Sequence, residues 1–202
     1  MSAVLGYEAM AGEEMAERVW VDTPGSHRFR TGCKDELLAA ICELRPRKGA
    51  RLVLLGTEVD GLAEAARQKL LGRVGFVPAS GGLISSLNAW ENISLPVAYH
   101  TPKKLAALPA QVRELLDELG GVDQRMLARL PEDLTLYEKR LAGFVRALLE
   151  SPELMVVENL AAGLGPTKRR RVARFAEVYQ RRCPGGTWVQ LEEHQASSEE
   201  EG

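Results

Sequence analysis

The chain has 202 residues, a formal net charge of −2 and 45% hydrophobic residues, enough apolar material for one sizeable buried core. Its pI near 6.0 argues against dominant nucleic-acid binding, and it has no apolar run as long as a bilayer requires. Acidic residues near the start do not fit a secretory signal, and three widely separated cysteines predict reduced thiols in a cytoplasmic protein rather than a metal site.

The first part of the chain gives weak structural signals. Residues 1–17 are polar and predict a flexible N-terminus, and 18–21 predict an edge strand. Residues 34–44 place their apolar side chains on one side of a helix, and strands are the alternative for this segment. The apolar run 51–56 predicts a buried strand, and the acids that follow it predict the start of a helix that ends at Leu71.

The middle of the chain predicts a helical subdomain over about residues 87–133. It includes an amphipathic helix at 109–119 that ends at a pair of glycines. We expect this subdomain to lie within one domain that covers residues 18–195. The acidic composition of 196–202 predicts a disordered tail.

The clearest pattern joins a helix to a buried strand. Residues 138–150 form an amphipathic pattern, and the helix ends at Ser151 because Pro152 disfavours helical geometry in the residue before it. The apolar run 154–157 then predicts a parallel strand that is covered on both faces. Glu158 follows at the carboxyl end, where it would hold Mg²⁺ in a ligand site; the alternative is a solvated acid at the end of a buried strand.

Segments around this strand resemble the ATP-binding subunits of ABC transporters. Residues 134–140 are similar to the signature segment, 153–166 to the Walker B strand and D-loop, and 73–84 to the strand and Q-loop that precede the helical subdomain. The resemblance covers about residues 43–194. It points in particular to the ATPases of the Mce-associated phospholipid transporters, which maintain outer-membrane lipid asymmetry.

The resemblance implies an α/β fold with a mostly parallel, P-loop-NTPase-like sheet flanked by helices and a helical subdomain. It also implies a reduced or missing antiparallel β subdomain, because the chain between Gly56 and Arg73 is much shorter than in the family. In the family the helical subdomain grips a permease. The residues that we expect to dock a partner are Leu83, Trp90, Ile93 and Leu95.

The reactive positions of the family are changed. A P-loop needs glycine amides around phosphate, a lysine for its charge and a hydroxyl for Mg²⁺. We place this loop after the strand at 51–56, where it contains Gly56 and Gly61 and has Leu62 and Ala63 at the lysine and hydroxyl positions. Such a loop would not hold a triphosphate.

The other positions that contact nucleotide in the family are changed as well. Ala79 stands at the Q-loop glutamine, Thr135, Leu136 and Tyr137 stand in the signature, Glu158 and Asn159 replace the Walker B aspartate and the catalytic glutamate, and His194 matches the switch histidine. Removing one preorganised donor from a transition-state site costs about 3 to 4 kcal/mol, so turnover by this chain alone should be negligible.

These features predict a catalytically degenerate ABC ATPase-like subunit that needs neither a metal nor another cofactor. It would act as a structural or regulatory part of a lipid transport system, bound to a permease or an active ATPase subunit at the inner face of the inner membrane; self-association stays open. One alternative is a weak or composite ATPase that uses ATP and Mg²⁺ with Glu158 and His194. Another is a nucleic-acid-binding regulator that uses the basic residues of 168–182, although such charges ordinarily form a solvated helix face.

Overall fold

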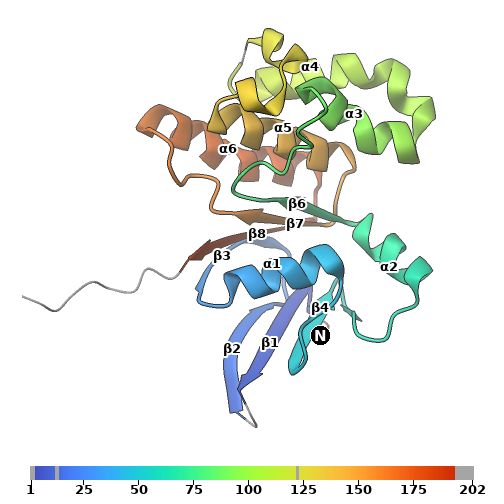
Figure 1. Cartoon of the computed structure of the whole chain (residues 1–202), viewed down its shortest axis with the longest axis vertical. Helices are drawn as coiled ribbons and strands as arrows, with labels where there is room; N and C mark the ends of the chain where they lie inside the picture. The colour runs from blue at the N-terminus through green and yellow to red at the C-terminus, as the bar shows by residue number, and fades with distance from the viewer. Residues whose placement is uncertain (1–2, 12–13, 122, 194–202) are drawn as a thin grey trace, which may run out of the picture.

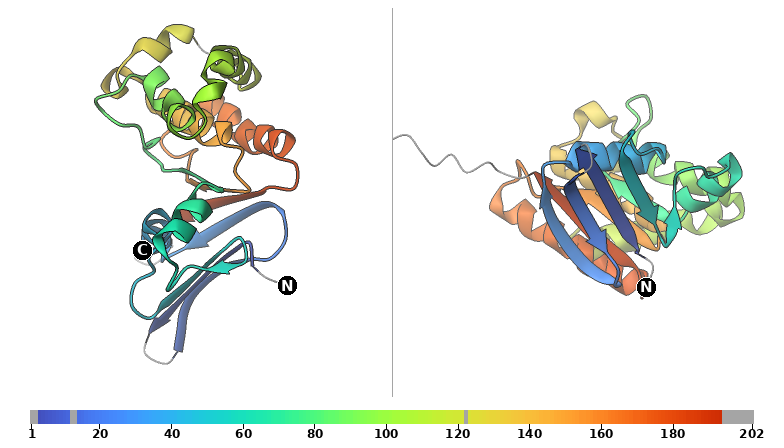
Figure 2. Two further views of the ribbon diagram at one scale, coloured as in Figure 1. Left: turned by 90° about the vertical axis from the view of Figure 1, so that its right-hand side faces the viewer. Right: turned by 90° about the horizontal axis from the view of Figure 1, so that it is seen from below.

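The structure is a computed structural model that describes residues 3–11, 14–121 and 123–193. Its elements form layers, which Figure 1 shows from an antiparallel sheet at the bottom, through helix α1 (Lys34–Glu43) and a parallel sheet, to a group of helices at the top. Figure 2 shows the same layers from the side and from below. In such a fold ligands bind at the edge where the strands of the parallel sheet all end.

The parallel sheet has the strand order β3-β8-β7-β6. Its strands are β3 (Gly25–Thr31), β6 (Val74–Val77), β7 (Leu154–Glu158) and β8 (Thr187–Glu193). All three neighbouring pairs are parallel. The predicted buried strand at 154–157 is confirmed as β7.

The central strand β7 explains why an apolar run without alternation folds in this way. Leu154 and Val156 belong to the core on the α1 side of the sheet. Met155 and Val157 belong to the core under the helices on the other side. Because both faces of β7 are buried, every one of these positions requires an apolar side chain.

The antiparallel sheet has the order β2-β1-β4-β5. Its strands are β1 (Leu5–Ala11), β2 (Glu14–Val21), β4 (Ala50–Leu54) and β5 (Thr57–Glu58). β2 forms one edge, as predicted for 18–21. The sheet corrects two expectations: residues 5–11 and 14–17 form strands rather than a flexible N-terminus, and an antiparallel sheet of four strands is present rather than missing. That the sheet is reduced relative to the family stays a prediction.

The predicted strand at 51–56 also has a different place from the one expected. It is β4, and it pairs antiparallel with β1 rather than joining the parallel sheet. Leu52 and Leu54 are fully buried and pack in the same core as α1 (Lys34–Glu43), which is confirmed as a helix. The acids after β4 do not begin a helix, because Glu58 lies in β5 and α2 (Glu64–Leu71) starts later.

The helical subdomain lies on the side of the parallel sheet opposite α1. It contains α3 (Ala89–His100), α4 (Leu108–Glu118) and the short 3-10 helices η1 (Pro102–Ala107), η2 (Gln124–Ala128) and η3 (Pro131–Asp133). α5 (Leu136–Leu149) and α6 (Pro166–Arg182) lie between it and the sheet. Within the described ranges, no helix has both the length and the apolarity needed to span a bilayer.

Candidate functional site

The connection between β3 and α1 lies at the carboxyl edge of the parallel sheet, where α/β proteins bind ligands. β3 ends at Thr31 and α1 begins at Lys34, so only Gly32 and Cys33 join them. A strand, a glycine-containing loop, a lysine and a helix follow one another here in the order of a P-loop. Lys34 therefore takes the position of the P-loop lysine.

This geometry corrects the placement of the P-loop after Gly56. Gly56 lies in the turn between β4 and β5 with a φ of 78°, and 61–63 precede α2. Gly56 lines a hollow of 620 Å³ together with Glu153 and Thr187, which lie at the amino ends of β7 and β8. The prediction placed the loop near the amino ends of the parallel strands, because it took β4 for a strand of the parallel sheet.

The β3–α1 connection does not fit a triphosphate with Mg²⁺. A P-loop follows the pattern G-x-x-x-x-G-K-[ST], whose amides surround the phosphates and whose hydroxyl binds the metal. Here Asp35 replaces the hydroxyl residue, and the amide of Cys33 already donates to Thr31 Oγ1 at 3.2 Å. The Thr31 hydroxyl in turn donates to the carboxylate of Glu17 at 3.0 Å. The connection is short of amides and has two carboxylates nearby, which repel an anion.

Lys34 forms an ion pair with Glu158 across the edge of the sheet. The Lys34 Nζ to Glu158 Oε1 distance is 2.7 Å, and the two side chains are only 14% and 17% exposed. The hydrogen bond from Lys34 to Glu158 raises the pKa of the Lys34 ammonium, and partial burial opposes this shift without reversing it. The other oxygen of Glu158 accepts the backbone N–H of Ala79 at 2.9 Å. Glu158 lies at the carboxyl end of β7, as predicted, but its charge is already matched within the chain.

Arg140 holds the same peptide segment from the other side. Its Nε donates to the carbonyl of Ala79 at 2.6 Å, and its Nη1 donates to the carbonyls of Leu160 and Ala162 at 2.8 and 2.6 Å. The residue is 3% exposed, and burial lowers the pKa of its guanidinium. Sequence reasoning missed Arg140, although it lies four residues before the buried Phe144 and thus on the buried face of α5.

Asn159 follows Glu158 and turns the chain away from β7. Its φ is 34°, in the left-handed region that asparagine tolerates better than most residues, and its N–H donates to the carbonyl of Leu191 at 2.9 Å. An amide side chain at this position is not a general base. His194 lies outside the described residues, so its predicted role stays a prediction.

The signature positions at the start of α5 form an N-terminal cap. Thr135 and Glu138 make a capping box, in which each side chain accepts the backbone N–H of the other residue, at 3.3 and 2.8 Å. Tyr137 is buried and its hydroxyl donates to the carbonyl of Leu119 at 3.4 Å, whereas Leu136 is exposed. Burial alone would raise the pKa of Glu138, but hydrogen bonds from Thr135 and from Arg129 outweigh it, and the pKa is lowered.

A hollow of 460 Å³ lies against this cap and is lined by Thr135, Tyr137, Glu138 and Lys168. The Lys168 ammonium lies 4.4 Å from the centre of the Tyr137 ring, a cation–π contact. Tyr137 thus fills the space that a glycine would leave open. Glu138 places a carboxylate at the positive end of the α5 dipole.

Sequence relatives of known type cover much of the chain. It is 33% identical over 127 residues to the methionine import ATP-binding protein MetN of Corynebacterium efficiens, which is 63% of this chain and 34% of that protein. It is 30% identical over 149 residues to MetN 1 of Rhodopseudomonas palustris, which is 73% of this chain and 39% of that protein. The chain is a relative of the ABC transporter ATP-binding subunits.

Other comparisons agree on the fold. The ATP-binding cassette MJ0796 bound to ADP and Pi superposes with a TM-score of 0.70 at 16% identity, covering 96% of this chain and 88% of that one. CbiO1 from Clostridium perfringens, part of the ABC transporter complex cbiONQ, gives a TM-score of 0.69 at 13% identity, covering 96% and 79%. No protein-family model matches the chain. The chain spans well under half the length of the curated relatives described here.

The residues of the helical subdomain that were predicted to dock a permease differ in exposure. Ile93 is fully buried, which corrects its assignment as a docking residue. Leu83 and Trp90 are partly buried and pack against the core. Leu95 is 41% exposed, and the structure adds Tyr99, which is 82% exposed and lies one turn further along the same face of α3.

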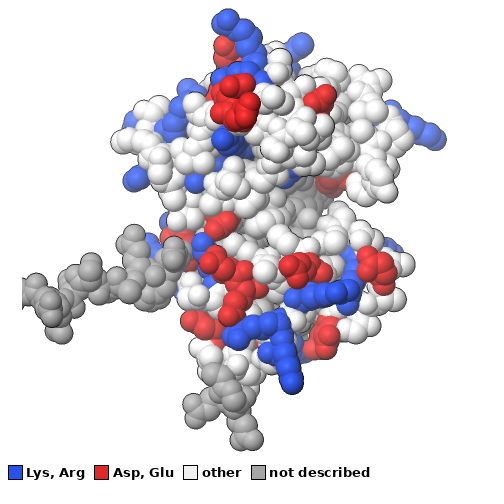
Figure 3. All heavy atoms as spheres, in the orientation of Figure 1, with Lys and Arg blue, Asp and Glu red and all other residues white. Residues whose placement is uncertain are grey.

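The segment before α3 carries a further exposed apolar side chain. Ile84 is exposed, and the buried Asn92 fixes its backbone by accepting the Ile84 N–H at 2.7 Å and donating to the Ile84 carbonyl at 3.0 Å. We call Ile84, Leu95 and Tyr99 the α3 surface. Figure 3 shows a largely uncharged area over the helical subdomain on the right, whereas charged side chains crowd the lobe below.

The basic residues of 168–182 are partly neutralised within the chain. Arg181 and Arg182 contact Glu118 at 2.6 and 2.7 Å, and Arg182 also contacts Glu114 at 2.6 Å. These pairs join the end of α6 to α4. They favour the solvated, ion-paired helix face over a phosphate-binding surface for this half of the run.

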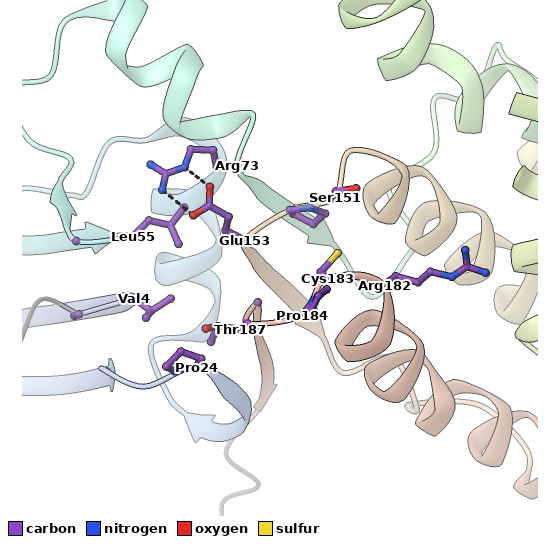
Figure 4. Close-up of a pocket in the computed structure, with 15 residues that line it drawn as sticks. Val4, Pro24, Leu55, Arg73, Ser151, Glu153, Arg182, Cys183, Pro184 and Thr187 are labelled. Atoms are coloured by element: carbon purple, nitrogen blue, oxygen red, sulfur yellow. Dashed lines mark hydrogen bonds and ion pairs between the residues drawn. The ribbon is translucent and has the colours of Figure 1, made fainter. Parts of the chain in front are cut away.

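The largest hollow described above lies away from the site edge. In Figure 4, Arg73 and Glu153 point toward one another at its wall, and Arg73 donates to both carboxylate oxygens at 2.7 and 2.8 Å. The charges here are matched, and the hollow opens at the amino ends of the strands. Within the described part of the chain, His, Cys, Asp and Glu side chains form no cluster of three or more that would hold a metal ion.

Proposed function

We propose that this chain is a non-hydrolysing structural or regulatory subunit of an ABC-type transport system. The observation that carries the proposal is the ion pair of Lys34 with Glu158 beside a connection made of Gly32 and Cys33 alone. In a working site the P-loop lysine neutralises the β and γ phosphates and the Walker B acid supports Mg²⁺. Here the two residues neutralise one another.

Nucleotide binding would have to overcome this arrangement. ATP would need to break a pair of largely buried charges and find amides that the short connection does not provide. Leaving one of these largely buried charges without its partner costs about 1 to 3 kcal/mol, roughly a tenfold to hundredfold loss of affinity. Glu17 and Asp35 add unfavourable charge.

The start of α5 argues against a composite site that this chain would form with a partner, and it therefore supports the same proposal. In an active dimer of ATPase subunits, signature amides would face the γ-phosphate of a partner. Here the Glu138 carboxylate occupies the N–H of Thr135, and the Tyr137 ring fills the adjoining space. A phosphate that approached this helix end would meet a carboxylate instead of a free amide.

The α3 surface supports the part of the proposal that concerns docking to a partner. Leu95 is 41% exposed and Tyr99 is 82% exposed on the same face of α3, and exposed apolar side chains that lie together are typical of a protein interface. We propose that the α3 surface binds an ABC permease, or an assembly that contains an active ATPase. The assignment of the cargo as phospholipid is the finer part of the proposal, and it rests on the resemblance to the Mce-associated ATPases.

A nucleotide titration tests the catalytic part. The intact chain is titrated with a fluorescent ATP analogue with and without Mg²⁺, beside a catalytically active ABC ATPase as the positive control. We expect no saturable signal at micromolar concentrations, where functional sites typically bind. Magnesium-dependent micromolar binding would favour the composite ATPase and contradict the proposal.

A membrane pull-down tests docking. Tagged wild-type chain and the Tyr99→Asp variant are used to capture partners from detergent-solubilised membranes, and the captured proteins are identified by mass spectrometry. Met15→Asp is the matched control, because Met15 is exposed on the other lobe. We expect the wild type and Met15→Asp to capture a permease or an ATPase, and we expect Tyr99→Asp to capture neither. Capture of neither class by the wild type would remove the docking proposal.

A further inference from the structure

We propose that the Lys34–Glu158 ion pair fixes the orientation of the helical subdomain without nucleotide. The proposal rests on the proposed non-hydrolysing function and assigns a task to the residues of the altered site. The contacts run from Lys34 through Glu158 and Ala79 to Arg140, and we call this set the Lys34–Arg140 link. It joins α1, β7, the segment after β6 and α5.

The first half of the link starts from rigid parts of the molecule. α1 lies between the two sheets, with Leu37 and Ile41 buried in the shared core. β7 is central in the parallel sheet and buried on both faces. Lys34 at the start of α1 and Glu158 at the end of β7 therefore meet with little further loss of backbone freedom, which leaves more of their attraction as net stabilisation.

The second half holds the segment that leads to α3. The Ala79 peptide donates its N–H to Glu158 and accepts from Arg140 through its carbonyl, so both of its polar groups are engaged. Arg140 also donates to the carbonyls of Leu160 and Ala162 and thereby ties the chain after β7 to α5. The guanidinium is planar, so these contacts fix its orientation as well as its position.

The close contact of Gly81 with α5 transmits this constraint. A Cβ built on Gly81 would lie 2.9 Å from the backbone nitrogen of Arg140, and Gly81 has a φ of 89°. The segment after Ala79 therefore lies directly on the backbone of α5. Because this segment continues to Ile84 and then to α3, its position determines how the α3 surface is presented relative to α1.

A distance measurement between α1 and α3 tests the proposal. Cys42 is exposed on α1, whereas Cys33 and Cys183 are buried, and Tyr99→Cys adds a second exposed thiol on α3. Both sites are spin-labelled under native conditions and measured by pulsed electron paramagnetic resonance. Protein without Tyr99→Cys must give no dipolar signal, which verifies that the buried thiols stay unlabelled.

The labelled protein is compared with its Lys34→Met and Lys34→Arg variants. We expect one narrow distance distribution in the parent, unchanged by ATP with Mg²⁺, at least a doubling of its width in Lys34→Met, and a width near that of the parent in Lys34→Arg. Arg51→Met is the matched control, because it removes an exposed ion pair with Glu58 inside the antiparallel sheet. It should leave the distribution unchanged.

The outcomes separate the two proposals. An unaltered width in folded Lys34→Met protein, as judged by circular dichroism and gel filtration, overturns the link. A shift of the parent on adding ATP with Mg²⁺ overturns the non-hydrolysing function, whatever the variants do. If Lys34→Met does not fold, Glu158→Gln carries the same test, because glutamine keeps an acceptor for the Ala79 N–H and removes only the charge opposite Lys34.

Discussion

Gly143 on α5 lies against the carbonyl group of Gly81, and a Cβ at position 143 would overlap that oxygen. The segment after β6 and the helix thus meet backbone to backbone. In an ordinary helix a glycine is unfavourable by about 1 kcal/mol relative to alanine. Gly143 is retained inside α5 because only a residue without a side chain admits the contact.

Gly143→Ala should therefore destabilise the protein despite the higher helix propensity of alanine. We expect a loss of about 1 to 3 kcal/mol in the free energy of unfolding, because backbone atoms must move apart. Urea denaturation followed by circular dichroism measures it. Gly72→Ala is the matched control: Gly72 has helical geometry and its nearest neighbour atom would lie 3.7 Å from the added Cβ. An equal stability of both variants would contradict the close contact.

A double-mutant cycle should detect strong coupling between Lys34 and Glu158. Lys34→Met leaves a largely buried carboxylate without its partner, and Glu158→Gln leaves an ammonium in the same position. We expect each single change to cost about 1 to 3 kcal/mol and the double variant to cost clearly less than their sum. Strictly additive losses would mean that the two charges do not stabilise one another.

The same coupling should depend on pH in the alkaline range. The pKa of Lys34 is raised in the folded chain, so its contribution to stability is fully present below the unfolded value of about 10.4 and is lost as the pH rises through the folded value. We expect the coupling energy from the cycle to be constant near neutral pH and to fall above about pH 10.4. A coupling that does not decline above about pH 10.4 would contradict the assignment of the pair to the Lys34 ammonium.

The capping box of α5 should contribute stability that acid removes. Thr135→Ala removes the N-cap and should cost about 0.5 to 2 kcal/mol. The pKa of Glu138 is lowered in the folded chain, so its contribution is present above the unfolded value of about 4.3 and is lost as the pH falls through the folded value. Glu138→Gln should be less stable than the wild type near neutral pH, and the difference should shrink below about pH 4. Thermal melts at a series of pH values measure it.

Asn92 should be among the costliest polar side chains to replace. It is fully buried, and its amide serves the Ile84 N–H and the carbonyls of Ile84 and Leu87. Asn92→Leu leaves these backbone groups without partners, at about 1 to 3 kcal/mol each. We expect a large drop in melting temperature, whereas Asn88→Asp, which keeps an N-cap acceptor for α3, should change little.

The sequence predicted the parts of the fold whose signals are local. α1, α4, α5 and β7 have the expected type and nearly the expected bounds, and Glu158 lies at the strand end where it was expected. Apolar spacing and a helix-ending proline determine such features within a few residues of themselves. The contacts of Lys34 and Arg140 were not predictable in this way, because their partners lie far along the chain and only the folded sheet brings them together.

Two predictions from the sequence were wrong for physical reasons. The β1 strand was missed although Leu5, Tyr7 and Ala9 are buried and alternate with Gly6 and Glu8, a period-two signal that the surrounding polar residues obscured. The P-loop was misplaced because its glycine pattern is absent from the β3–α1 connection, while the turn after β4 offered glycines in a similar context. The strands β3 and β4 are distinguished by their pairing partners, because β3 pairs parallel with β8 and β4 pairs antiparallel with β1, and local composition does not reveal this.

The brevity of the β3–α1 connection limits how this molecule could be given a P-loop. Exchanging one side chain for another alters charge and shape but adds no peptide units, and only Gly32 and Cys33 lie between Thr31 and Lys34. Engineering phosphate binding at this edge would therefore require inserted codons as well as substitutions.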